Sequence, residues 1–457
     1  MKVLVVGGGF AGLAAAVALQ ERRHDVVLLE RRGVLGGRAT SSRDAVTGDD
    51  VDNGTHLMVG AYRSTLALAR RAGASDLLLE QDDLRIEWVD DRGRTALDCP
   101  PLPAPLHLAA GLLGLRVPLA VKLQAARLGL AVRFGPRPEG LTLAEYFARC
   151  GQGEEARRLL WDPLALAILN EPPERAAASL FHRVYQEAFL SGHRASRLVF
   201  LRRGWAVFHD RVARYLEGRG GVVRRGVRVE GLVLDGDGRV SGARLAERPR
   251  EREAIASGAR PRERTERADA VVCAVPPDAL AALLPDEVRG RAPFDVLDRF
   301  GGAPIVSVDL WLDRVVVDAP MLGLRDSEVE WVFDKGRLAG RAGAPQHLSF
   351  IVSAAYRSAA KPNAELVGAA EAALRRYFPA MAGAAVVRAL VLRDPRATFA
   401  SSPQLEGLRP GPRTPLPGLY VAGDWTATGL PATIEGAVRS GEAAAEALRE
   451  DEAVPGR

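Results

Sequence analysis

A glycine-rich turn begins at residue 7, between a short apolar strand and an alanine-rich helix. Residues 3–6 are apolar and mostly β-branched, which is typical of a buried strand. Gly7, Gly9 and Gly12 have the G-x-G-x-x-G spacing, which combines a tight turn, room for a pyrophosphate and close helix packing. The helix expected over residues 11–21 would point its first amides at a phosphate. This pattern predicts a Rossmann-like α/β unit that binds a dinucleotide.

An acidic residue ends the second predicted strand, where this fold recognises a ribose. Residues 26–29 are apolar, and Glu30 follows them directly. Its carboxylate would accept a hydrogen bond from a ribose hydroxyl and would repel a 2′-phosphate. Phe10, Ala11 and Arg31 lie in the same two turns and complete the predicted contacts. We therefore expect a dinucleotide without a 2′-phosphate.

The segment after the acid distinguishes FAD from NAD. Residues 31–38 are Arg-Arg-Gly-Val-Leu-Gly-Gly-Arg. This segment resembles its counterpart in the amine-oxidase and phytoene-desaturase superfamily of flavoproteins, where Gly-Gly-Arg lies along the FAD pyrophosphate. The resemblance implies that Gly37 and Arg38 contact FAD.

Two further segments are similar to FAD-contacting segments of that superfamily. Residues 51–60 contain an acid-x-Gly turn, and by resemblance Thr55, His56 and Leu57 should lie near the isoalloxazine ring. A strand near Val229 is expected to pair its backbone with the adenine.

The far end of the chain completes the predicted site. A strand over residues 418–424 ends in Gly423-Asp424, and an acid there can hold ribitol hydroxyls. The helix that follows would direct its first amides at the flavin and stabilise the anion of the reduced ring. These amides belong to Ala432, Thr433 and Ile434. Because no Cys or His lies between residues 423 and 434, we expect FAD to bind without a covalent link.

The chain is similar over nearly its whole length to one branch of the superfamily. This branch is the squalene-associated FAD-dependent desaturases, also called hydroxysqualene dehydroxylases, of bacterial hopanoid synthesis. The Gly-Asp-Trp-Thr block is the most specific match, and the chain departs from the pattern in its Gly-Trp-Ala-Val turn at 204–207 and in a long insert at 247–267. The matching blocks are residues 52–56, 162–164, 169–170, 330–334 and 423–435.

The family implies a reaction and its requirements. Reduced FAD would deliver a hydride to hydroxysqualene, a C30 isoprenoid, and the allylic hydroxyl would leave to give squalene. The departing hydroxide needs a proton or a hydrogen-bond donor. His56 is the candidate, by its predicted position alone. Contact with synthases of the squalene pathway is also expected, and the electron donor is not identified.

The resemblance also implies a two-domain α/β architecture. A Rossmann-like FAD-binding domain, discontinuous in sequence, is expected from residues 1–62, 215–290 and 415–457. An α+β substrate-binding domain is expected from residues 63–214 and 291–414.

Three alternative functions remain open. A carotenoid or phytoene desaturase would share the fold and run an oxidation. A flavin amine oxidase usually carries a Lys near the flavin from a central strand, yet no Lys lies between Lys122 and Lys335. A non-catalytic FAD-binding partner of a terpenoid synthase would bind flavin without turnover.

The charge and composition of the chain limit the kinds of ligand, partner and cellular compartment that we expect. The net charge is +5, with no basic patch interleaved with aromatic residues, so nucleic acid is not expected. The three cysteines show no metal spacing and indicate reduced thiols in the cytoplasm, and the seven histidines form no metal motif. A strand starts almost at once, leaving no room for a signal peptide. The cysteines are Cys99, Cys150 and Cys273.

The stretch over residues 100–134 is rich in leucine and interrupted by Arg116, Lys122, Arg127 and Arg133. No uncharged run reaches the ~20 residues that a transmembrane helix needs. Apolar bulk with interspersed cations favours a helical region that lies on the inner face of the cell membrane. The alternative is an ordinary pair of core helices around Pro118.

Overall fold

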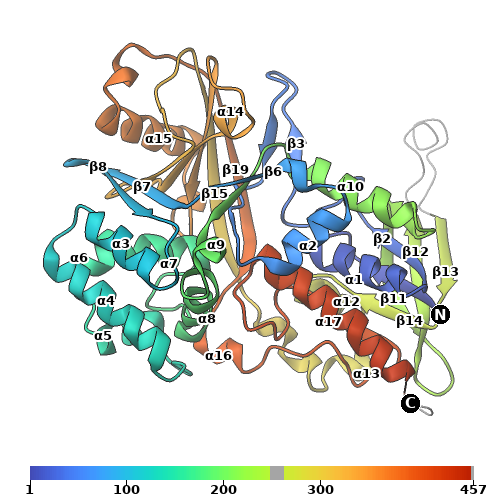
Figure 1. Ribbon diagram of the computed structural model, residues 1–457. Helices are drawn as coiled ribbons and strands as arrows, with labels where there is room; N and C mark the ends of the chain where they lie inside the picture. The colour runs from blue at the N-terminus through green and yellow to red at the C-terminus, as the bar shows by residue number, and fades with distance from the viewer. Residues whose placement is uncertain (248–261, 454–457) are drawn as a thin grey trace.

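The computed structural model describes residues 1–247 and 262–453 (Figure 1). One half of the molecule is built on a five-stranded parallel sheet in the order β10-β2-β1-β14-β20. The strands come from distant parts of the chain: β1 (Lys2–Val6), β2 (Asp25–Glu30), β10 (Val222–Arg225), β14 (Ala270–Cys273) and β20 (Leu419–Val421). β1 is central and pairs with β2 and β14, so the predicted strand–helix–strand unit organises this sheet.

Both faces of the parallel sheet are covered, which explains why its strands are continuous apolar runs. Val3 and Val5 pack with three helices, α1 (Phe10–Glu21), α10 (Trp205–Glu217) and α17 (Ile434–Glu452). Leu4 and Val6 face a second cluster formed with β11 (Val227–Leu234), β12 (Val240–Glu247) and α12 (Pro277–Leu283). β11 and β12 form an antiparallel hairpin that turns around Asp235–Gly238.

The other half of the molecule is built on a seven-stranded, mostly antiparallel sheet in the order β19-β15-β18-β17-β16-β7-β8. Its strands are β7 (Leu84–Asp90), β8 (Gly93–Cys99), β15 (Gly302–Leu312), β16 (Met321–Leu324), β17 (Trp331–Asp334), β18 (Gln346–Val352) and β19 (Val386–Phe399).

The helix α15 (Asn363–Tyr377) covers one face of this sheet, and a helical lobe lies against the other. The lobe occupies the left of Figure 1 and consists of α3 (Leu106–Gly114), α4 (Leu119–Phe134), α5 (Leu143–Arg149), α6 (Glu154–Ala156), α7 (Asp162–Leu169), α8 (Ala178–Val184) and α9 (His193–Ser196).

The remaining elements are short. The small strands are β3 (Ser41–Arg43), β4 (Asp50–Asp52), β5 (Met58–Val59), β6 (Leu78–Glu80), β9 (Leu198–Leu201) and β13 (Arg262–Arg267). The short helices are α2 (Arg63–Arg71), α13 (Asp286–Arg289), α14 (Lys335–Leu338) and α16 (Pro403–Glu406). The insert predicted at 247–267 begins in β12 and ends in β13, and its middle lies outside the described residues.

The 100–134 stretch forms a helix pair with a break before Pro118, so α3 and α4 are separate. Leu115 and Leu128 are buried in the lobe, whereas Leu113 and Leu123 are exposed. The stretch thus supplies both a core face and an apolar outer face. Within residues 1–247 and 262–453, no helix has the length and apolarity needed to cross a bilayer.

The helices α1 and α17 pack closely because small residues line their contact. A Cβ added at Gly441 of α17 would lie 2.1 Å from the Ala11 carbonyl oxygen and 2.8 Å from the Ala15 nitrogen. Both neighbours are backbone atoms of α1, so they cannot swing aside as a flexible side chain could.

We predict that Gly441→Ala lowers the free energy of unfolding by about 1–3 kcal/mol, the usual cost of overpacking. Gly368→Ala on α15 is the matched control, since a Cβ there meets nothing within 4 Å. The control should instead gain up to about 1 kcal/mol, because alanine favours helix. Denaturant unfolding measures both, and equal stability of the two variants would contradict the prediction.

Candidate functional site

Two glycine segments face each other at the carboxyl edge of the parallel sheet. Gly7 has φ +108°, and a Cβ at Gly12 would lie 1.8 Å from the Gly7 carbonyl oxygen, so the first turn requires glycine at both positions. A Cβ at Gly9 would have Gly37 as its nearest neighbour, at 3.7 Å. The predicted pyrophosphate contacts from residues 7–12 and 36–38 therefore lie side by side, next to the first turn of α1.

Glu30 is held in place by the backbone of these turns. Its two carboxylate oxygens accept hydrogen bonds from the amides of Gly8 and Arg32, each at 2.8 Å. The side chain is buried at the ends of β1 and β2. This fixes a carboxylate where a ribose would lie, whereas the neighbouring Arg31 is exposed.

An ion pair between Arg38 and Asp424 joins the N-terminal and C-terminal segments of the predicted site. Asp424 is buried, and Arg409 fixes the loop around it. The Arg409 guanidinium donates to the carbonyl oxygens of Asp424 at 2.7 Å and Leu430 at 2.9 Å. Sequence reasoning missed Arg409, because no motif marks a residue that acts through backbone carbonyls. The loop it holds carries Gly423 and leads into α17.

The N-terminus of α17 is capped and fixed against the first half of the chain. The Thr433 hydroxyl accepts a hydrogen bond from the Gly436 amide at 3.0 Å. Glu435 accepts from the Thr65 amide at 2.9 Å and from Arg439 at 2.8 Å, so it caps α2. Ala432 and Thr433 remain partly exposed beside this helix end, and Ile434 is buried. The first amides of α17 are thus positioned by contacts on both sides.

The 51–60 segment passes between the two halves. His56 Nδ1 donates to the Gly54 carbonyl oxygen at 2.7 Å, and its ring lies edge-on to Trp205 with centroids 5.9 Å apart. Burial lowers the pKa of His56, so the imidazole is neutral at neutral pH. The Thr55 hydroxyl lies 3.4 Å from the Ser349 hydroxyl of β18. The segment therefore contacts the seven-stranded sheet directly.

The two remaining predicted contacts, Leu57 and Val229, lie in different apolar clusters. Leu57 packs against the apolar cluster of the helical lobe. Val229 of β11 packs in the same cluster as Leu29, near the end of β2 that carries Glu30. These clusters belong to the helical lobe and to the parallel sheet, so the two positions lie in different parts of the molecule.

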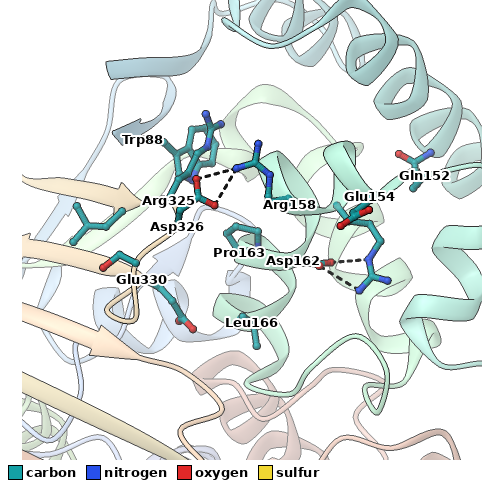
Figure 2. Close-up of a pocket in the computed structure, with 13 residues that line it drawn as sticks. Trp88, Gln152, Glu154, Arg158, Asp162, Pro163, Leu166, Arg325, Asp326 and Glu330 are labelled. Atoms are coloured by element: carbon teal, nitrogen blue, oxygen red, sulfur yellow. Dashed lines mark hydrogen bonds and ion pairs between the residues drawn. The ribbon is translucent and has the colours of Figure 1, made fainter. Parts of the chain in front are cut away.

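A cavity of about 730 Å³ lies between α7 and the turn that joins β16 to β17 (Figure 2). Trp88, Pro163, Leu166 and Leu324 supply its apolar wall. Ion pairs of Arg158 with Asp326 and of Arg157 with Asp162 lie at its polar side. Its volume is in the usual range for small-molecule sites.

Glu330 lines this cavity without a cationic partner among the described residues. One carboxylate oxygen accepts a hydrogen bond from the Ser353 amide at 3.1 Å. Burial away from water raises the pKa of Glu330 from its ordinary 4.5 to about 7. The 330–334 motif was noticed in the sequence, but the role of its first residue depends on the surrounding packing.

Residues 10–449 match the family model of flavin containing amine oxidoreductases. Hydroxysqualene dehydroxylase of Rhodopseudomonas palustris is 32% identical over 453 residues, covering 97% of each chain. The chloroplastic/chromoplastic 15-cis-phytoene desaturase of Glycine max is 26% identical over 481 residues, covering 99% of this chain and 80% of its own.

Among solved structures, an oxidoreductase from Methanosarcina mazei superposes with a TM-score of 0.73 at 17% identity. The match covers 98% of this chain and all of that one, and it supports the expected α/β flavoprotein fold.

The raised pKa of Glu330 predicts a stability that falls with pH. Below pH 4.5 the folded and unfolded states both hold the proton, and above that the unfolded chain releases it first. Stability is therefore lost as pH rises through about 7. Relative to the native chain, Glu330→Gln should gain about 2 kcal/mol in unfolding free energy between pH 5.5 and 8.5.

The matched control is Glu328→Gln. The hydrogen bond from Lys361, at 2.6 Å, lowers the pKa of Glu328, so this variant should show no such gain. Urea unfolding at both pH values measures the difference. If the unfolding free energies of the native chain and of Glu330→Gln change in parallel with pH, the pKa of Glu330 is not raised in the folded state.

Proposed function

Because this chain belongs to the flavin-containing amine oxidoreductase family, we propose that it is an FAD-dependent enzyme that converts hydroxysqualene to squalene. The observation that carries the proposal is the 32% identity to the Rhodopseudomonas palustris hydroxysqualene dehydroxylase, which extends over 97% of both chains. Weaker identity to a phytoene desaturase supports that reaction only as the alternative within the same superfamily.

The residues present suit FAD. Gly9 and Gly37 lie against each other and carry no side chains, so a pyrophosphate can approach both backbones closely. Glu30 is set for a ribose, and Asp424 for ribitol hydroxyls. The first amides of α17 would meet the electron-rich side of the ring. No Cys or His lies in the segment from 423 to 434, so binding is non-covalent, and acid precipitation should release all the flavin.

The overall reaction replaces a C–O bond by a C–H bond and releases water, so it consumes a hydride and a proton. Reduced flavin supplies the hydride when it is bound. The chain must place the allylic carbon, exclude competing water and protonate the departing hydroxyl. His56 is neutral and its Nδ1 proton is engaged by Gly54, so it suits hydrogen bonding to the hydroxyl better than donating the proton.

A C30 alcohol is hardly soluble in water, so the enzyme must exchange it with a lipid bilayer. α4 presents an outer apolar stripe of Leu119, Leu123, Leu130 and Phe134, all more than 60% exposed and all on one helix face. Leu113 of α3 is 74% exposed nearby, and exposed arginines flank the stripe. This surface suits peripheral attachment to the anionic inner face of the cell membrane.

The decisive experiment supplies hydroxysqualene to photoreduced, anaerobic, flavin-loaded protein. One squalene per reduced flavin is expected, with reoxidation of the flavin. In parallel, oxidised protein receives phytoene and a quinone acceptor. Desaturated phytoene without squalene formation would overturn the proposal in favour of the alternative.

We predict that Glu30→Ala weakens flavin binding roughly ten- to a hundredfold, since a charge-assisted hydrogen bond contributes about 1.5–3 kcal/mol. Asp25→Ala, which removes an exposed carboxylate from the start of the same strand, is the matched control. Flavin titration of the apoprotein measures both affinities. Equal affinity of the two variants would refute the ribose assignment.

Replacing Leu113, Leu119, Leu123 and Leu130 with Ser should lower binding to anionic liposomes at least tenfold, because each buried leucine contributes about 1.5–3 kcal/mol. High salt should release the native chain only in part. Leu112 and Leu115, in the same stretch, are left unchanged because they pack inward.

The control replaces Val46 and Val387, which are exposed elsewhere, with Ser. Both variants should keep their flavin content. Undiminished flotation of the leucine variant with liposomes would show that another surface meets the membrane.

A further inference from the structure

The proposed dehydroxylation needs a proton, and one face of the seven-stranded sheet carries a line of polar side chains into the protein. Residues two apart on a strand share a face, so Ser307, Asp309 and Trp311 of β15 are aligned. Cross-strand pairing sets Ser349 opposite Asp309 and His347 opposite Trp311. These five residues form what we call the polar strip.

The centre of the polar strip is a buried histidine–carboxylate pair. His347 Nε2 donates to Asp309 Oδ1 at 2.8 Å, and both side chains are at most 5% exposed. The Trp311 ring stacks on the imidazole, with centroids 4.1 Å apart and planes at 10°. Trp311 is fixed in turn by its hydrogen bond to Asp49 at 2.8 Å. The imidazole is therefore held in one orientation.

The inner end of the strip has polar atoms that lack partners. Asp309 Oδ2 and Ser307 Oγ are fully buried, and neither has a hydrogen bond within the described residues. A buried polar atom without a partner is costly and calls for an explanation. A Cβ added at Gly54 would lie 4.0 Å from the Ser307 hydroxyl oxygen, and the Thr55 hydroxyl lies 3.4 Å from the Ser349 hydroxyl. The unpartnered atoms thus lie beside the segment predicted to contact the flavin ring.

The outer end of the strip opens on a polar cavity of about 320 Å³, which His347 also lines. A cavity of this size and polarity can hold several water molecules. Its charged walls include Arg43, Asp50, Asp52, Arg203, Lys335 and Arg341. His347 is therefore placed between a wet cavity and the buried carboxylate.

We propose that His347 and Asp309 form a proton relay from this polar cavity to the flavin site. A proton from cavity water passes to His347, then to Asp309, and then through Oδ2 or the Ser307 hydroxyl to the departing oxygen. Protonation lets the C–O bond break and the hydroxyl leave as water, and bound reduced flavin would supply the hydride for the new C–H bond. This relay rests on the proposed function.

Glu330 and His56 are the other two groups considered as a proton source, and neither occupies this position between the polar cavity and the predicted flavin site. Glu330 binds the amide of Ser353, four residues beyond Ser349 on β18, which corresponds to roughly 13 Å along the strand. His56 has its Nδ1 proton engaged by Gly54. The relay instead ends in atoms that still have free hydrogen-bonding capacity.

The charged groups around His347 come from several elements and must be considered in any pH effect. Asp309 faces it from β15, Asp49 from the turn before β4, and Arg388 of β19 lies 5.7 Å from the Trp311 ring. Lys335 and Arg341 line the same cavity. Asp309→Asn isolates the relay among these groups, because its amide oxygen can still accept from His347 while no carboxylate remains to carry a proton.

The test compares native, His347→Gln and Asp309→Asn holoenzyme in single-turnover dehydroxylation across pH. We expect both variants to react about a hundredfold more slowly and to lose the native pH profile. His24→Gln is the matched control, a buried histidine 3.6 Å from Glu452 at the far side of the parallel sheet, and should react at the native rate. Flavin content and circular dichroism establish that the variants fold.

A second measurement does not depend on turnover. Protonation of an imidazole stacked on indole quenches its fluorescence, so the tryptophan emission of flavin-free protein should titrate with pH. The titration should vanish in His347→Gln and persist in His24→Gln. A titration unchanged by His347→Gln would show that His347 does not exchange protons with the cavity and would overturn the relay.

The outcomes separate the two proposals. If the native holoenzyme forms squalene, and Asp309→Asn and His347→Gln react with its rate and its pH profile, the relay alone is overturned. Absence of squalene formation by the native holoenzyme overturns the proposed function, and the relay with it. Slow variants that keep the native pH profile would assign the pair a structural role and would also reject the relay.

Discussion

Close packing between α1 and α17 brings together the two ends of the chain, and the predicted cofactor site depends on it. Both helices follow strands of one parallel sheet and therefore start at the same edge (Figure 1). Small residues at the contact, including Ala11 and Gly441, allow the backbones to approach. The Arg38–Asp424 ion pair and the Glu435 cap of α2 then fix the N-terminus of α17 against segments near the start of the chain.

The seven-stranded sheet provides two different environments on its inner side. At one place the wall is polar, with Ser307 and Ser349 beside the Gly54–Thr55 segment and the His347–Asp309 pair next to them on the same strands. Farther along β18, the wall borders a cavity with an apolar side, where burial raises the pKa of Glu330 to about 7. A reaction that protonates a group on a hydrocarbon substrate needs both an apolar and a polar environment. Because side chains alternate along β15 and β18, one face of the sheet supplies the polar environment while the other face stays apolar under α15.

The helical lobe shows how one segment can serve two surfaces. In α4, Val121, Ala125, Leu128 and Val132 are buried, while Leu119, Leu123 and Leu130 are exposed on another face. A helix that is apolar on both faces has little contrast between them, so its sequence pattern cannot say which face is inside. The neighbours of the helix decide this, and they leave an apolar stripe beside exposed cations.

Much of the fold followed from local patterns in the sequence. The glycine turn, the acid after β2 and the helix after Gly423-Asp424 could be predicted because each depends on residues close together in the chain, whose spacing has a direct geometric meaning. Arg409, Glu330 and the His347–Asp309 pair could not, since each acquires its environment from strands or loops distant in sequence. A carboxylate's pKa depends on the burial around it, and a polar strip depends on the register of β15 against β18. Packing and register are properties of the folded chain, so only the tertiary structure could assign those residues a place.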